Sequence, residues 1–294
     1  MKHFITLLAG AGLTAAVPLQ TRSTNTFFFT FGDSYTWTSF DATGTQPTAG
    51  NPMGNPTLGT GATGGGINWV GDLTTVNNAS LVLSYNLAVG GASIDNNLVK
   101  TNTKQDMTTQ VGLFETTYSQ KPASAAWSSD NAVFGFWIGI NDIGWGNANN
   151  EPSVLIPKLM AQYKTLAEKI YSNGGRKFIF LNVPPTSRSP KVIGSGTSAV
   201  NTHATWIKAY NEALDKMVDE FIAGHSGTRT VTYDTWSFMS KILDSPSTYG
   251  FTDASCVNSD GETCVWWDAY HPGKKYHALQ AADMKEHMHS LGAW

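Results

Sequence analysis

The residue types that acyl transfer requires occur near both ends of this chain. Ser34 lies in "FFFTFGDSYT", residues 27–36, where a polar triplet ends an otherwise apolar run. A serine hydroxyl becomes a nucleophile when a base removes its proton, and histidine suits that task near neutral pH. Asp268 precedes His271 by three residues, so one loop can hold both, and a carboxylate on the far ring nitrogen fixes the tautomer. Taken alone, Ser34 is typical of a turn residue. Together with Asp268 and His271, it is a candidate nucleophile.

Acyl transfer also needs fixed donors for the negative oxygen of the tetrahedral intermediate. Backbone N–H groups at a glycine turn and a neutral Asn amide qualify, and each can lower the barrier by about 3 kcal/mol. The chain offers the glycine pair Gly90 and Gly91 four residues after Asn86, and Asn141 in the segment "GIND" at 139–142. These residues are candidates for an oxyanion hole.

The fold must bring these residues together. Short runs rich in Phe, Val and Ile indicate buried strands at 26–31, 81–87, 132–138 and 177–183, with a weaker run at 229–233. Helical patterns lie at 105–118, 153–172 and 202–223, and a last helix is expected from Pro272 to about His289. Strands that alternate with helices predict a parallel sheet, and ligands bind outside the carboxyl ends of its strands. We expect one three-layer α/β domain over residues 17–294, with the candidate residues at those ends.

The segment 38–66 interrupts this alternation. It is rich in Gly, Pro, Thr and Asn, and it follows the Gly-Asp-Ser triplet directly. Loops of this length are uncommon in compact domains and are usually functional or disordered. We expect this loop to lie over the candidate site.

Composition narrows the class of protein. Charged residues make up 14% of the chain and the formal net charge is −3, which argues against a nucleic-acid partner. Two cysteines, Cys256 and Cys264, are too few for a zinc site and allow one disulfide. We therefore expect no metal site in this chain.

The N-terminus predicts export. Residues 1–16 combine a basic start, an apolar stretch and small residues suited to cleavage, which is typical of a secretory signal peptide. The stretch is too short for a stable membrane span. A disulfide and the N-glycosylation sequon at Asn78 both fit an oxidising compartment. We predict a secreted, extracellular protein without stable membrane insertion and with a candidate N-glycan on Asn78.

Taken in order, these segments resemble the four blocks of the GDSL/SGNH hydrolase superfamily. The blocks are the Gly-Asp-Ser triplet, the glycine pair after Asn86, the Gly-x-Asn-Asp segment and the Asp-x-x-His segment. The resemblance implies a flavodoxin-like sandwich of strand order 2-1-3-4-5, and serine esterase chemistry without a metal or organic cofactor. One position departs from the pattern, because Tyr35 stands where the family name expects Leu.

The resemblance also implies residue roles. Ser34 is the implied nucleophile, His271 the general base and acid, and Asp268 the residue that orients His271. The implied oxyanion hole uses the Ser34 N–H, a glycine N–H and the Asn141 side chain, and the spacing N-x-A-x-x-G favours Gly91 over Gly90. The aspartates of the first and third blocks, Asp33 and Asp142, are expected to be structural.

Aromatic residues near the blocks bear on the substrate. Trp37, Trp145 and Trp267 are candidate platforms for a sugar ring, although Trp266 and Trp267 can also pack beneath their own loop. The strings "FGDSYT", "NLAVGGAS" and "GINDIG" resemble secreted fungal acetylesterases of carbohydrate esterase family 16. That resemblance implies removal of acetyl groups from hemicellulose-derived oligosaccharides. The alternatives are a lipase or lysophospholipase of the same fold, and a non-catalytic sugar-binding protein.

Overall fold

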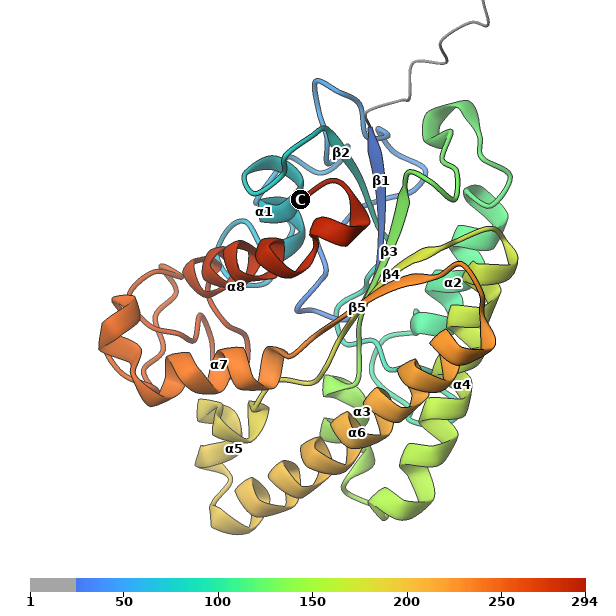
Figure 1. The fold of residues 1–294 in the computed structure, drawn as a ribbon. Helices are drawn as coiled ribbons and strands as arrows, with labels where there is room; N and C mark the ends of the chain where they lie inside the picture. Colours follow the sequence, from blue (N-terminus) through green and yellow to red (C-terminus); the bar gives the residue numbers. More distant parts are fainter. Residues whose placement is uncertain (1–24) are drawn as a thin grey trace, which may run out of the picture.

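The computed structural model describes residues 25–294, so the expected signal peptide at 1–16 lies outside the described residues. The described chain forms a five-stranded parallel sheet with the order β2-β1-β3-β4-β5 (Figure 1). The strands are β1 Thr26–Gly32, β2 Val82–Asn86, β3 Ala132–Trp137, β4 Lys177–Leu181 and β5 Arg229–Tyr233. The predicted α/β sandwich and its strand order are confirmed.

Helices cover both faces of this sheet. In Figure 1, α1 and α8 lie together against one face, and α2, α4 and α6 cover the other. Shorter helices α3, α5 and α7 lie toward the carboxyl ends of the strands. The bounds are α1 Trp69–Thr75, α2 Met107–Thr117, α3 Ile140–Gly146, α4 Pro152–Ser172, α5 Pro190–Gly194, α6 Thr197–Gly224, α7 Thr235–Asp244 and α8 Lys274–His287.

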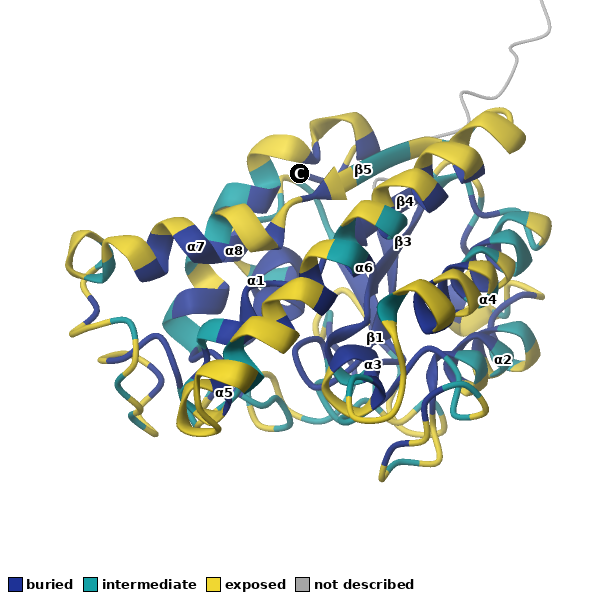
Figure 2. Ribbon diagram, turned by 90° about the horizontal axis from the view of Figure 1, so that it is seen from below, coloured by how far each residue is buried: buried dark blue, intermediate teal, exposed yellow. Residues whose placement is uncertain are grey.

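The aromatic run of β1 forms the centre of the core. Successive strand residues point to opposite faces, so Phe28 packs against Trp69 of α1 and Phe29 against Phe114 of α2. Both phenylalanines are fully buried, and burying such a side chain contributes about 1.5–3 kcal/mol. Figure 2 shows β1, β3 and β4 buried between helices whose outer faces are exposed, whereas the edge strand β5 is partly exposed. Burial on both faces explains why these runs lack an alternating pattern.

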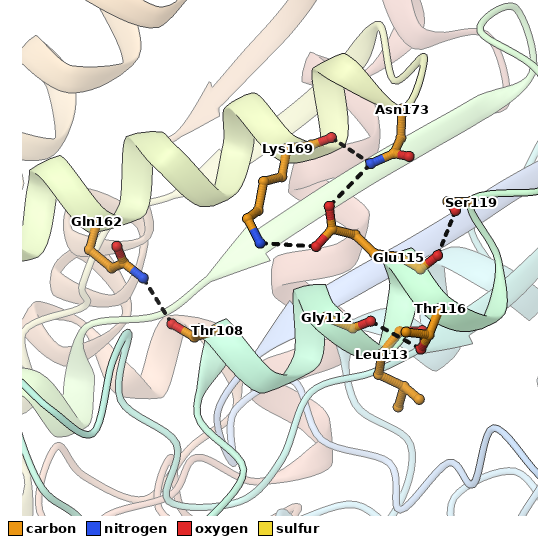
Figure 3. Close-up of polar contacts among 9 residues, drawn as sticks. All are labelled: Thr108, Gly112, Leu113, Glu115, Thr116, Ser119, Gln162, Lys169 and Asn173. Carbon is orange, nitrogen blue, oxygen red and sulfur yellow. Dashed lines mark hydrogen bonds and ion pairs between the residues drawn. The ribbon is translucent and has the colours of Figure 1, made fainter.

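Polar contacts at the surface join α2 to α4 (Figure 3). The carboxylate of Glu115 accepts hydrogen bonds from Lys169 at 3.0 Å and from Asn173 at 3.4 Å. In the first turn of α2, the Thr108 hydroxyl accepts a hydrogen bond from the Gln162 side chain. Such exposed pairs contribute less than about 1 kcal/mol each, so burial against the sheet holds this layer.

The structure corrects the predicted start of the last helix. We expected it at Pro272, but α8 begins at Lys274 with Gly273 as its N-cap residue. Pro272 forms an isolated antiparallel bridge with Trp266, and the Gly273 N–H donates to the Val265 carbonyl. These contacts hold the backbone before α8 extended, so the helix cannot begin at the proline.

A second apolar cluster supports the segment before α8. It contains Met239, Ile242, Leu243, Phe251, Val265, Trp266 and Tyr276. Beside it, Cys256 and Cys264 form the predicted disulfide, with Cα atoms 5.5 Å apart. Among residues 25–294, no helix is both long and apolar enough to cross a bilayer.

Candidate active site

Ser34 lies in a tight turn directly after β1. The turn is fixed by Asp33, whose buried carboxyl group accepts a hydrogen bond from the Tyr35 N–H at 3.0 Å. Before the turn, the side chain of Gln110 on α2 both donates to and accepts from the backbone of Gly32, at 2.9 Å in each case. The position of Ser34 is thus set by helix α2 as well as by the strand.

The loop before α8 brings His271 against Ser34, although 237 positions separate them in the chain. The Ser34 Oγ lies 2.8 Å from His271 Nε2, and His271 Nδ1 lies 2.8 Å from Asp268 Oδ2. The other Asp268 oxygen accepts the backbone N–H groups of Tyr270 and His271, each at 2.7 Å. Asp268 therefore organises its own loop and orients the imidazole.

The charge of Asp268 fixes the tautomer of His271. Partial burial raises the pKa of the Asp268 carboxyl, but the hydrogen bond and charge of His271, together with the backbone donors, outweigh it and lower the pKa to about 2. An ionised carboxylate only accepts hydrogen bonds, so His271 Nδ1 carries a proton. The lone pair of Nε2 is then free to accept the Ser34 hydroxyl proton.

The glycine pair and Asn141 lie side by side. The Asn141 amide donates to the Ala92 carbonyl at 3.0 Å, which joins it to the residue after Gly91. Gly91 has a positive φ of 78°, and a Cβ there would meet only Thr103, at 3.9 Å. At Gly90 a Cβ would approach Trp37 to 3.1 Å. Gly91 thus borders open space, whereas Gly90 is covered by Trp37.

Asp142 supports these donors from beneath. Its carboxylate is fully buried and accepts the Ile94 N–H, at 3.1 and 3.3 Å from its two oxygens. Burial raises the pKa of Asp142 to about 7, although its backbone hydrogen bonds act in the opposite direction. Its contacts are those of a residue that holds the 90–94 loop in place.

The comparisons with known proteins place the chain in a family. A family model described as GDSL-like lipase/acylhydrolase matches residues 28–284. The chain belongs to this family. The expectation of a carboxylic ester hydrolase is confirmed at that level.

Individual relatives agree with the family assignment. The chain is 39% identical over 283 residues to an acetylesterase of Thermothelomyces thermophilus, covering 94% of this chain and 93% of the relative. It is 23% identical over 300 residues to an acetylesterase of Hypocrea jecorina, covering 84% of each. Among solved structures, it resembles an acetylxylan esterase of Geobacillus stearothermophilus with a TM-score of 0.52. The two structures align over 91% of this chain and 94% of the esterase chain. Their sequences are 15% identical, so the likeness supports the fold alone.

The long 38–66 loop of this GDSL hydrolase contacts both halves of the site. The Thr63 hydroxyl donates to the backbone carbonyl of Ser34, and the Gly64 carbonyl accepts the Lys274 N–H at 2.8 Å. At Gly65 a Cβ would meet the Trp267 ring at 2.8 Å, so the loop packs directly on that indole. The composition of the loop predicted its proximity but not these contacts, which sequence reasoning missed.

A cavity of about 630 Å³ opens beside Asn141. Its volume lies in the range of ligand-binding pockets. The residues that line it include Asn141, Trp145, Lys191, Ser198, Thr202 and Tyr270. Hydroxyl and amide groups thus line the cavity together with small apolar residues and one exposed indole.

The predicted aromatic platforms have different surroundings. Trp145 is 49% exposed and lines the cavity beside Asn141. Trp37 is half-buried over Gly90, and Trp267 donates from its ring nitrogen to the Ser259 carbonyl at 3.1 Å. Trp266 is fully buried in the apolar cluster beneath its loop. Of the predicted platforms, Trp145 therefore has the surroundings that suit a sugar ring best.

Proposed function

We propose that this GDSL hydrolase is a secreted serine esterase that removes acetyl groups from hemicellulose-derived oligosaccharides. The observation that carries the proposal is the chain of short contacts from Ser34 through His271 to Asp268, in a member of an acylhydrolase family. The choice of acetyl as the acyl group rests on the acetylesterase of T. thermophilus, which is 39% identical to this chain.

In the first half of the proposed reaction, Ser34 Oγ attacks the acetyl carbonyl carbon while His271 Nε2 takes the hydroxyl proton. The carbonyl oxygen becomes negative and is stabilised by the N–H groups of Ser34 and Gly91 and by the Asn141 amide. The intermediate then collapses: the carbon–oxygen bond to the sugar breaks, and His271 returns the proton to the departing sugar oxygen. The products are the free sugar hydroxyl and acetylated Ser34.

In the second half, water takes the place of the sugar alcohol. His271 Nε2 removes a proton from the water as its oxygen attacks the acetyl carbon of the acyl-enzyme. The bond to Ser34 Oγ then breaks, the proton passes to that oxygen, and acetic acid leaves and loses its own proton to the solvent at neutral pH. Throughout both halves, Asp268 remains ionised and stabilises the imidazolium that forms on His271.

The cavity beside Asn141 supports a carbohydrate on the alcohol side of the ester. Hydroxyl, amide and indole groups suit a sugar, because its rings stack on aromatic faces and its hydroxyls need hydrogen-bond partners. A long acyl chain would favour an aliphatic trough instead. The lipolytic alternative is therefore the weaker one, and membership of a hydrolase family disfavours a non-catalytic sugar-binding protein.

Export forms part of the same proposal. Residues 1–16 carry the signal-peptide pattern, and the Cys256–Cys264 disulfide suits an oxidising compartment. In the folded chain, the Asn78 amide nitrogen donates to the Ser80 carbonyl at 2.9 Å. Glycosylation of Asn78 would have to break this hydrogen bond. The N-glycan on Asn78 stays a prediction.

The test is acetate release from acetylated xylo-oligosaccharides, measured beside the hydrolysis of 4-nitrophenyl esters from acetate to palmitate. The proposal predicts acetate release and a steep fall in kcat/KM beyond acetate. A maximum at long acyl chains would favour the lipolytic alternative. Hydrolysis of none of these esters would reject the esterase proposal itself.

A further inference from the structure

The cavity beside Asn141 contains one formally charged group, the ammonium of Lys191. The cavity is bounded by residues of α3, α5 and α6 and by Tyr270, the neighbour of His271. No aspartate or glutamate is among the described residues that line it. A substrate whose carbonyl oxygen is bound by the Asn141 amide would lie next to this cavity.

Lys191 is fixed to the loop that carries His271. Its backbone N–H donates to the Ala269 carbonyl at 2.8 Å, and its Nζ lies 4.9 Å from the centroid of the Tyr270 ring. A cation over an aromatic face is attracted by the electron density of the ring. The ammonium is therefore held beside the site and does not sample the whole surface.

The charge of Lys191 is not neutralised within the described chain. Ion pairs with carboxylates between residues 25 and 294 include those of Lys164, Lys169, Arg188, Lys208 and Lys274. Lys191 forms no ion pair with a carboxylate in this part of the chain, so its positive charge is available to an anionic ligand.

The neighbouring imidazole of His203 adds no second charge. His203 is buried at the base of the cavity, where its Nε2 pairs with the Thr186 hydroxyl at 3.0 Å. Burial, with a smaller effect of the Lys191 ammonium, lowers the pKa of His203 to about 4. At neutral pH the cavity thus offers a single cation among hydroxyl, amide and aromatic groups.

We propose that this cavity is the subsite for the alcohol portion of the substrate and that Lys191 recognises a carboxylate on it. The favoured substrates are then acetylated oligosaccharides that carry a uronic acid. Trp145 supplies the face for a sugar ring, and the polar residues of α6 supply hydrogen bonds. This inference rests on the proposed esterase function and specifies its substrate class.

The experiment compares acetate release from acetylated xylo-oligosaccharides with and without a uronic acid substituent, at low ionic strength. The readout is the ratio of kcat/KM for the acidic substrate to kcat/KM for the neutral one. For the wild-type protein we expect a ratio of about three to ten, because exposed charge pairs contribute modestly. We expect Lys191→Gln to bring the ratio to about one and Lys191→Arg to retain most of it. The wild-type ratio should also shrink as salt is added.

Lys216→Gln is the matched control, because Lys216 is exposed on α6 and does not line the cavity. It should keep the wild-type ratio. A wild-type ratio of one, or a ratio that survives in Lys191→Gln, would overturn the inference while leaving the esterase proposal intact. Hydrolysis of 4-nitrophenyl acetate distinguishes the failure of this inference from the failure of the esterase proposal. If the wild-type protein does not hydrolyse this ester at all, the esterase proposal itself is wrong. If Lys191→Gln fails to fold, the salt dependence of the wild-type ratio decides.

Discussion

The hydroxyl of Tyr35 donates a hydrogen bond to the backbone carbonyl of Tyr270, the residue before His271. The contact joins the turn that carries Ser34 to the loop that carries the imidazole. The Tyr35 ring is buried and its centroid lies 5.6 Å from that of His271. A leucine, which the family name places at this position, could fill the space but could not make this bond.

Tyr35→Phe removes the hydroxyl and keeps the ring. We expect kcat for 4-nitrophenyl acetate to fall about threefold to tenfold, because the loop of His271 loses one hydrogen bond to the turn that carries Ser34. The free energy of unfolding should fall by about 1 kcal/mol, since the Tyr270 carbonyl loses its partner. Steady-state kinetics and urea denaturation measure both. An unchanged kcat in a destabilised variant would show that the bond is purely structural.

Thr63→Val tests the role of the 38–66 loop. It removes the hydrogen bond to the Ser34 carbonyl at nearly constant volume, so we expect kcat to fall several-fold. The matched control is Thr60→Val, because the Thr60 hydroxyl bonds only to Thr57 within the same exposed loop. Equal kinetics for the two variants would remove any positioning role from Thr63.

Asp33 makes stability depend on pH. Burial raises the pKa of its carboxyl to about 8, although the hydrogen bond from Tyr35 acts in the opposite direction. Between about pH 4 and pH 8 the folded state therefore holds a proton that the unfolded state has lost. The stabilising effect of that proton is complete below about pH 4 and is lost as the pH rises toward 8.

The side chain of Asp33→Asn cannot ionise. The free energy of unfolding of the variant, relative to that of the wild type, should therefore increase as the pH rises from 5 to 8. We expect a relative gain of about 1 kcal/mol or more over this interval. Urea denaturation of both proteins at several pH values measures the difference. Taking the difference cancels groups that do not interact with Asp33. Asp142 is not one of them, because its charge also raises the pKa of Asp33, so the difference reports this pair of carboxyl groups. A difference that stays constant with pH would show that Asp33 is ionised in the folded protein.

The disulfide is a separate source of stability. Cys256 and Cys264 are eight residues apart, and closing such a short loop in the unfolded chain stabilises the fold by about 2.5 kcal/mol. Replacing both cysteines by serine should lower the free energy of unfolding by about that amount. At 25 °C kcat should change little, because Trp266 still anchors the loop of His271 in the apolar cluster. A large loss of kcat without unfolding would assign the disulfide a role in the site.

Much of the fold could be predicted because its signals are local. The strands β1 to β4 are short buried runs, and the long helices α4 and α6 have a clear helical pattern. The edge strand β5 is only partly buried, which is why its run is the weaker signal. The helix α6 nevertheless begins at Thr197, five residues before the predicted 202. The short helices were missed, because two turns such as 69–75 in α1 carry too little periodicity and depend on tertiary packing.

In the candidate site, too, the features with a local sequence signal could be predicted and those that depend on tertiary contacts could not. Ser34, Asn141 and His271 could be proposed as site residues because polar residues directly after buried strands, or before the last helix, stand out in the sequence. The contacts of Thr63 with Ser34 and of Tyr35 with Tyr270 could not, because they join segments that only the folded chain brings together. The proposed role of Lys191 could not be predicted either, because a single lysine on a surface carries no local signal.

The central claim, that Ser34 is the nucleophile, is tested most directly by covalent labelling. The protein is treated with a 4-nitrophenyl phosphonate ester, digested, and searched by mass spectrometry for the modified residue. We predict a single adduct on Ser34, loss of ester hydrolysis in proportion to labelling, and no adduct in Ser34→Ala. Inactivation with the label on another residue, or wild-type rates of acetate release in Ser34→Ala, would contradict the account.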